Sequence, residues 1–94
     1  MYKIARRLER HLLGLAHYKR VYILLLLNES GNAGLVLDDI VSKTKIDQRN
    51  VSHHTLKLKQ AGLLDKQYQG RYVLHTLSPY GKKFVQFLLT LSHT

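Results

Sequence analysis

The stretch of residues 47–62, DQRNVSHHTLKLKQAG, places the strongest constraint on the fold of this chain. Val51, Thr55 and Leu58 recur at positions i, i+4 and i+7, which places them on one face of a helix. Asp47 can cap the first turn, because its carboxylate accepts backbone N–H groups that have no partner within the helix. Gly62 suits the left-handed position that ends a helix. The stretch therefore predicts an amphipathic helix with a defined start and end.

The other face of this helix is polar. It carries Gln48, Arg49, Ser52 and His53, with Lys57 one turn further on. Side chains of these types hydrogen-bond base edges and phosphates in nucleic-acid complexes. An ordinary solvated surface helix shows the same pattern, so the helix alone favours neither interpretation.

The segment after the helix favours nucleic-acid binding. Residues 63–68 and 71–77 are rich in strand formers, and Gln69-Gly70 between them can form the bend of a hairpin. The order VSHHTLKLKQAGLL followed by a basic hairpin resembles the recognition helix and wing entry of winged helix-turn-helix regulators of the ArsR type. It resembles the MarR and PadR types more loosely. The resemblance covers residues 18–91, and its most specific part is Val-Ser-x-His at 51–54 with Ala-Gly-Leu-Leu at 61–64.

The chain departs from the pattern of that family at three positions. Lys45 stands where the family often has glycine, Thr55 where it often has leucine, and Leu56 where a polar residue is common. These departures concern the turn and the contact surface of the motif rather than its order of elements.

The remaining segments fit the same architecture. Residues 1–16 have the periodicity of an amphipathic helix, and the apolar run within residues 18–30 fits a buried helix better than a buried strand because it is rich in leucine. We expect a loop at 31–34, a short strand at 35–36, a helix at 37–44, a turn at Thr44-Lys45-Ile46, and a last helix capped by Ser78-Pro79. The resemblance implies a mainly α (α+β) winged helix-turn-helix fold in the order α-α-β-α-α-β-β-α. A single domain would then span residues 1–94, with the motif at about 37–61, the wing at about 63–77 and the last helix at about 79–91.

The charge of the chain indicates its class of partner. Fifteen Lys and Arg against six Asp and Glu give a net charge of +9 and a pI near 10.1, which favours nucleic acid or another anionic surface. Double-stranded DNA is therefore the expected partner. The predicted DNA-binding residues are Lys45, Gln48, Arg49, Asn50, Ser52, His53, Lys57, Tyr68 and Arg71. Tyr68 can also be an ordinary strand residue, with stacking on bases the less favoured role.

Two apolar stripes lie outside the predicted motif and wing. Exposed patches of this size are uncommon on monomers, so the stripes predict a homodimer. The first helix could alternatively lie on a membrane surface, although no Trp or Phe anchors it there. The predicted dimerisation residues are Ile4, Leu8, Leu12 and Leu15 on the first helix and Phe84, Leu88 and Leu91 on the last.

Other classes of function find little support. The longest apolar run, residues 21–27, is far shorter than the ~20 residues that span a bilayer, which favours a soluble, cytoplasmic protein. The chain has no cysteine, and its six acids are scattered, so neither a thiol site nor an enzyme active site is expected. ArsR-type metal sensing sites use cysteines in the first motif helix or Asp, His and Glu in the last helix; residues 41–44 have no Cys and 78–94 no acid. We therefore predict no metal site and no cofactor. No metal or small-molecule effector is evident in the sequence. His54 is expected to be packed or phosphate-bound rather than catalytic.

These observations predict a sequence-specific, homodimeric DNA-binding transcriptional regulator. The recognition helix would enter the major groove, with the wing on the adjacent backbone or minor groove. The alternative is a DNA-packaging or partition protein of the same fold that spreads along DNA. A winged helix that serves only protein interaction is a third interpretation, against which the charge pattern argues.

Overall fold

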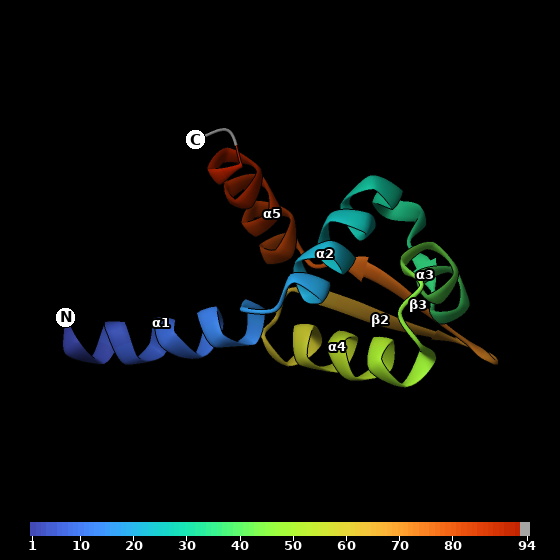
Figure 1. Ribbon diagram of the computed structural model, residues 1–94, viewed down its shortest axis with the longest axis horizontal. Helices are drawn as coiled ribbons and strands as arrows, with labels where there is room; N and C mark the ends of the chain where they lie inside the picture. Colours follow the sequence, from blue (N-terminus) through green and yellow to red (C-terminus); the bar gives the residue numbers. More distant parts are fainter. Residues whose placement is uncertain (93–94) are drawn as a thin grey trace.

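The computed structural model describes residues 1–92, with every side chain in that range except that of His11. Two helices extend away from a packed body that holds the other elements (Figure 1). The predicted order of helices and strands is confirmed, with a short 3₁₀ turn added in the loop after the second helix. The elements are α1 (Tyr2–Leu15), α2 (Tyr18–Ser30), η1 (Gly31–Ala33), β1 (Leu35–Val36), α3 (Leu37–Thr44), α4 (Gln48–Gln60), β2 (Leu64–Gln69), β3 (Tyr72–Leu77) and α5 (Pro79–Leu91).

Helix α2 forms the centre of the body. Its residues Ile23, Leu24 and Leu27 are fully buried, which confirms the prediction that the apolar run is a helix rather than a strand. They pack in one cluster with Ile40 of α3, Val51 and Leu58 of α4, Leu63 just before β2, Leu64 of β2, Leu77 of β3 and Val85 of α5. No helix within residues 1–92 is long and apolar enough to cross a bilayer.

Helix α4 begins and ends as its local sequence predicts. Asp47 Oδ1 accepts the backbone N–H of Asn50 at 2.9 Å, and Oδ2 accepts the Asn50 side-chain amide at 2.8 Å. The backbone hydrogen bond from Asn50 is the main cause that lowers the pKa of the Asp47 carboxyl. At the other end Gly62 has φ +78°, and the Leu63 N–H returns to the Leu58 carbonyl at 3.0 Å.

The sheet has three antiparallel strands in the order β1-β3-β2. Strands β2 and β3, with the turn between them, form the hairpin that we call the wing. Gln69 pairs with Tyr72, so the turn consists of Gly70 and Arg71. The predicted bend at Gln69-Gly70 was therefore one residue too early, because Gly70, at φ +60°, takes the first rather than the second turn position.

The turn between α3 and α4 places Lys45 in a left-handed conformation. Its φ is 62° and its ψ is 17°. Among the described residues, no other residue except glycine has a positive φ. The Lys45 N–H closes α3 by donating to the Val41 carbonyl at 2.8 Å. Lysine adopts this conformation at a cost of roughly 1–2 kcal/mol, which glycine avoids.

Replacing Lys45 with glycine is therefore expected to raise the free energy of unfolding by roughly 0.5–1 kcal/mol. Relief of the left-handed strain exceeds the extra freedom that glycine gains in the unfolded chain. Urea denaturation measures this change. Lys43→Gly, two residues earlier in the helix proper, is the matched control and should lower stability by about 1 kcal/mol. Equal destabilisation by both substitutions would show that the turn is not strained.

Candidate nucleic-acid interface

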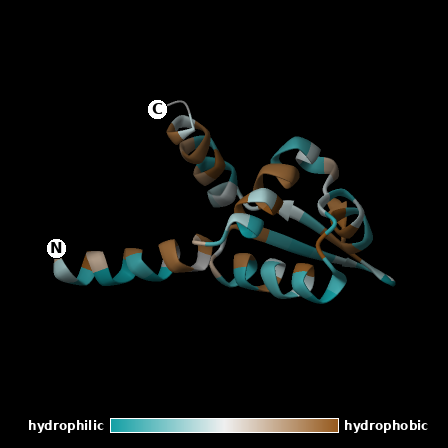
Figure 2. Ribbon diagram, viewed as in Figure 1, coloured by the Kyte–Doolittle hydropathy of each residue, from teal (hydrophilic) through white to brown (hydrophobic). Residues whose placement is uncertain are grey.

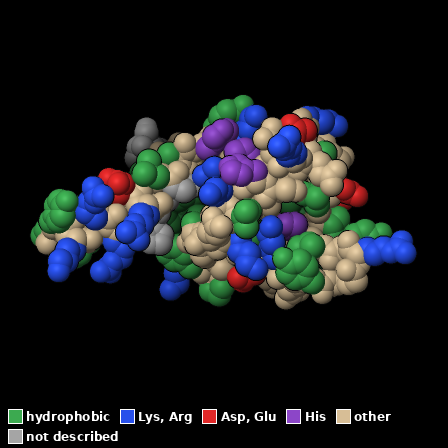
Figure 3. Space-filling model, turned by 90° about the horizontal axis from the view of Figure 1, so that it is seen from below, with side chains coloured by type: hydrophobic (Ala, Val, Ile, Leu, Met, Phe, Trp, Pro, Cys, Tyr) green, Lys and Arg blue, Asp and Glu red, His purple; other side chains and the backbone are tan. Residues whose placement is uncertain are grey.

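Helix α4 presents its polar face to solvent. Val51, Thr55 and Leu58 are buried, which leaves Arg49 and His53, four residues apart, on the opposite side. All nine of the predicted DNA-binding residues are exposed. Seen from the side of α4, the surface carries many Lys and Arg side chains, with histidines gathered near the middle (Figure 3). The structure thus offers a basic, polar face built on a rigid helix.

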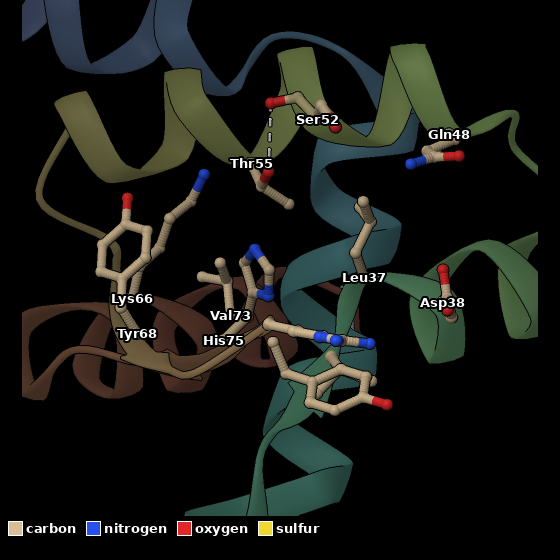
Figure 4. A pocket seen from close by; sticks show the side chains of 12 residues that line it. Leu37, Asp38, Gln48, Ser52, Thr55, Lys66, Tyr68, Val73 and His75 are labelled. Atoms are coloured by element: carbon tan, nitrogen blue, oxygen red, sulfur yellow. Dashed lines mark hydrogen bonds between the residues drawn. The ribbon is translucent and has the colours of Figure 1, made fainter.

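The wing stands beside this helix. Gln48 and Ser52 of α4 line one cleft together with Tyr68 and Arg71 of the wing (Figure 4). The fold therefore brings together four of the predicted residues from two elements that are distant in sequence. Arg49, His53 and Lys57 do not line this cleft.

Lys45 lies on the other side of the helix N-terminus, in a second hollow. Tyr18, Lys19 and Tyr22 of α2 line it together with Lys45 and Asp47. Sequence reasoning missed Tyr18 and Lys19, although a Tyr-Lys-Arg run at the start of α2 was a usable signal. These residues add a cation and an aromatic ring to the surface around the turn.

Asn50 is held by the helix cap. Because one of its two amide N–H groups donates to Asp47, the other N–H and the carbonyl oxygen are left for a further group. Its surroundings therefore suit helix capping, whatever contact it makes with a partner.

A histidine cluster joins α4 to the start of α2. His54 is 5% exposed, its Nδ1 accepts the Arg20 Nε–H at 3.1 Å, and its ring centroid lies 4.7 Å from that of His17. His17 in turn caps α2, its Nδ1 accepting the Lys19 N–H at 3.2 Å. His54 is thus packed, as predicted, and the residues it contacts are Arg20 and His17. The spacing of residues in the sequence gave no means of finding these partners.

This cluster keeps His54 in its neutral form. Burial is the main cause that lowers its pKa, followed by the charges of His17, Arg20, His53 and Lys19. Because the folded pKa is lowered, the unfolded chain takes up the proton first as the pH falls. The stabilisation is complete above the unfolded pKa of about 6.5 and is lost as the pH falls below it.

The free energy of unfolding is therefore expected to decrease as the pH falls from about 6.5 to about 5. Each histidine whose pKa is lowered in the folded state contributes at most about 1.4 kcal/mol per pH unit. Buried His75, whose pKa is also lowered by burial, contributes in the same direction. His54→Gln keeps an acceptor for Arg20 and should flatten this dependence, measured by urea denaturation at several pH values. His53→Gln, on the exposed neighbour, is the control; equal pH slopes in both variants would contradict the assignment.

The two projecting helices carry the apolar stripes, and hydrophobic residues follow both helices (Figure 2). Ile4, Leu8 and Leu12 are between 47% and 60% exposed, and Leu91 is 51% exposed. Phe84 and Leu88 are half-buried, and Phe84 forms edge-to-face contacts with Tyr80 and Phe87. Leu15 differs from the rest of the predicted set, because it is buried in the core of its own chain and needs no partner to cover it.

No group of three His, Asp or Glu side chains within the described residues is arranged to hold a metal ion. The side chain of His11, and all of His93, lie outside the described residues.

Several proteins of known structure share this fold. The protein-family model described as "Bacterial regulatory protein, arsR family" matches residues 17–66 of the chain. HlyU from Vibrio cholerae N16961 superposes with a TM-score of 0.82 at 24% identity over 100% of both chains. The homodimeric winged helix-turn-helix DNA-binding domain of Mb0332 from Mycobacterium bovis, a possible ArsR-family transcriptional regulator, gives 0.84 at 17% identity, covering 98% of this chain and 83% of that one. MepR of S. aureus, in its complex with DNA, gives 0.79 at 17% identity, covering 98% and 77%. No curated protein matches the chain by sequence.

Proposed function

The chain belongs to the ArsR family of bacterial regulatory proteins, and from that premise we propose that it is a transcriptional regulator that binds double-stranded DNA sequence-specifically as a homodimer. The observation that carries this proposal is the exposed polar face of α4 beside a basic wing. In winged helix-turn-helix complexes the second helix of the motif enters the major groove. Helix α4 would take that role here, with residues 1–94 acting as one DNA-binding domain.

The roles of individual residues follow from their positions. Arg49 and His53, near the N-terminal end of α4, would read base edges, with arginine suited to guanine O6 and N7. Gln48, Asn50 and Ser52 would flank them. Lys45 and Lys57 would bind phosphates, and Tyr68 and Arg71 on the wing would contact the adjacent backbone or minor groove.

Binding selection from random DNA, followed by footprinting, tests the proposal. We expect one enriched inverted repeat with half-sites about one helical turn, ~10 base pairs, apart or a multiple of it. Its footprint should stay bounded as protein concentration rises. A footprint that lengthens without a shared sequence would instead indicate a DNA-packaging or partition protein, and absence of salt-sensitive binding would exclude both functions.

The proposed dimer would bury the exposed stripe of α1 together with α5. This arrangement is in keeping with the homodimeric state of the Mb0332 domain, whose fold is similar. Among the described residues, α1 packs by its C-terminal end on α2 and α4, and the rest of the helix extends away from the packed body (Figure 1). A partner helix would therefore supply most of the burial that α1 needs.

Leu12→Glu is accordingly expected to convert the dimer to a monomer at micromolar concentration, because a carboxylate in an apolar interface is left without a partner. Sedimentation velocity measures the mass. Leu13→Glu is the matched control: Leu13 is 64% exposed on the same helix but lies off the stripe, so this variant should remain a dimer. A wild-type chain that sediments as a monomer would exclude the proposed dimer.

A further inference from the structure

The cleft between α4 and the wing has a polar inner end. Leu64 and Leu77 pair at the base of the wing, and the next pair outward on the same face is Lys66 with His75, followed by Tyr68 with Val73. Leu64 and Leu77 belong to the core, whereas Lys66, His75, Tyr68 and Val73 line a cavity of about 290 Å³. This volume is near the lower limit of the ~300–1,000 Å³ typical of small-molecule sites.

Lys66 is a half-buried cation at this inner end. Its ammonium group is directed toward α4 rather than away from the protein (Figure 4). Burial, and then the charge of Lys59, lowers the pKa of Lys66. No carboxylate within the described residues forms an ion pair with Lys66. An anion in the cleft would relieve the unfavourable burial of this charge.

His75 supplies a hydrogen-bond acceptor beside Lys66. Its Nδ1 lies 3.1 Å from the Leu35 carbonyl oxygen, which can only accept, so Nδ1 carries the proton of the neutral ring. Nε2 of the neutral ring is then an acceptor. Burial lowers the pKa of His75, which outweighs the opposite effect of its backbone hydrogen bonds to Leu35 and Val73. The ring is directed into the space below α4 (Figure 4).

The remaining walls favour a small planar molecule. Tyr68, Tyr72, Val73 and Leu37 provide apolar surface, and Asp38 lies across the cavity from Lys66 (Figure 4). The cleft thus offers two cations, Lys66 and Arg71, acceptors on His75 and Asp38, and apolar sides between them. This arrangement fits a planar body with a carboxylate at one end and a hydroxyl or N–H donor at the other.

We propose that this cleft binds a small planar organic acid and that its occupation opposes DNA binding. Gln48, Ser52, Tyr68 and Arg71, which line the same cleft, are also residues that we assign to the DNA surface. A ligand that contacts these side chains makes them unavailable to DNA. By linkage, bound DNA lowers the affinity for the ligand by the same factor by which the ligand lowers the affinity for DNA. The regulatory part rests on the proposed function, whereas ligand binding does not. The sequence alone made no such effector evident.

The first test uses the DNA-free protein with 3-hydroxybenzoate as the probe and 3-hydroxybenzyl alcohol as its uncharged counterpart. Titration followed by amide NMR shifts should map 3-hydroxybenzoate to residues 48–55 and 66–75. The alcohol should bind at least fivefold more weakly. Lys66→Gln should lower the affinity for 3-hydroxybenzoate at least fivefold. Lys83→Gln, which makes the same change of charge on α5, should leave this affinity unchanged. Shifts located elsewhere, or equal affinities in the two variants, would overturn the proposal.

The second test measures DNA affinity with and without 3-hydroxybenzoate. Competition should reduce the apparent DNA affinity by the factor 1 + [L]/Kd in the wild type, and by a correspondingly smaller factor in Lys66→Gln, whose Kd for the ligand is larger. Lys66→Gln without ligand should leave the salt dependence of DNA binding unchanged. A salt slope lower by about one, together with no binding of the organic acid, would show that the cleft holds a DNA phosphate and would overturn the proposal. If the protein bound no DNA at all, the proposed function would fail while the first test kept its result.

Discussion

Replacing Gly81 with alanine is expected to lower the free energy of unfolding by about 3 kcal/mol or more. An added Cβ at this position would overlap the Leu63 carbonyl oxygen and lie 3.2 Å from Ser78 Oγ. That carbonyl already accepts the Ser78 N–H at 3.1 Å, and Ser78 Oγ donates to the Gly62 carbonyl at 2.6 Å. Because backbone forms the obstacle, α5 must move away from the end of α4 to admit one methyl group.

Thermal and urea unfolding measure this effect. For a domain of this size, 3 kcal/mol corresponds to a fall in Tm of roughly 12–24 °C. Gly70→Ala separates crowding from backbone strain, since Gly70 has φ +60° but nothing within 4 Å of an added Cβ. The free energy of unfolding of this control variant should fall by only about 1 kcal/mol. A Gly81→Ala protein as stable as the control would show that α5 can shift freely.

Replacing Arg49 with alanine is expected to weaken binding to the best operator by about 1–3 kcal/mol, roughly 5- to 150-fold. The side chain is exposed in the first turn of α4, and its removal would abolish a bidentate hydrogen bond to guanine. Preference should relax at one base pair in each half-site. Affinities for operator and scrambled duplexes at several salt concentrations give the result.

Lys57→Ala is the matched variant for Arg49, because it removes a charge from the polar side of the same helix. It should weaken binding to all sequences similarly and lower the salt slope by about one for each phosphate that the lysine neutralises. If Arg49→Ala weakens operator and scrambled DNA equally, Arg49 binds the backbone and the assignment of the reading residues to α4 must be revised.

The elements that the sequence predicted correctly are those with local causes. Asp47 and Gly62 set the ends of α4 through hydrogen bonds and backbone angles within a few residues, and Ser78 caps α5 through the Gly81 N–H at 2.9 Å. The apolar run of α2 was ambiguous in the sequence, and burial of Ile23, Leu24 and Leu27 on a helix resolved it. Local chemistry was therefore sufficient for the ends of α4 and the start of α5, whereas the order of elements followed from the resemblance to winged helix-turn-helix regulators.

Contacts between distant segments were not predictable in the same way. Arg20 and His54 are 34 positions apart, and no spacing rule links them. Pairing of Lys66 with His75 depends on the turn at Gly70-Arg71; a shift in that turn would give Lys66 a different partner. The exposed face of α4 follows from periodicity, whereas the cleft beside it depends on this register and could not be derived from α4 alone.

The short first strand makes the length of the wing independent of the core. Strand β1 pairs only with His75 and Leu74 of β3, so the outer half of the wing is a two-stranded ribbon whose pairs, Tyr68 with Val73 and Gln69 with Tyr72, contribute no residue to the buried core. Two residues inserted in each strand would extend the tip by about 7 Å without exchanging its faces. That distance is close to the ~6 Å width of the minor groove. Insertions and deletions at the tip could thus change how far along the duplex related chains reach during evolution, while the packing that keeps them folded stays the same.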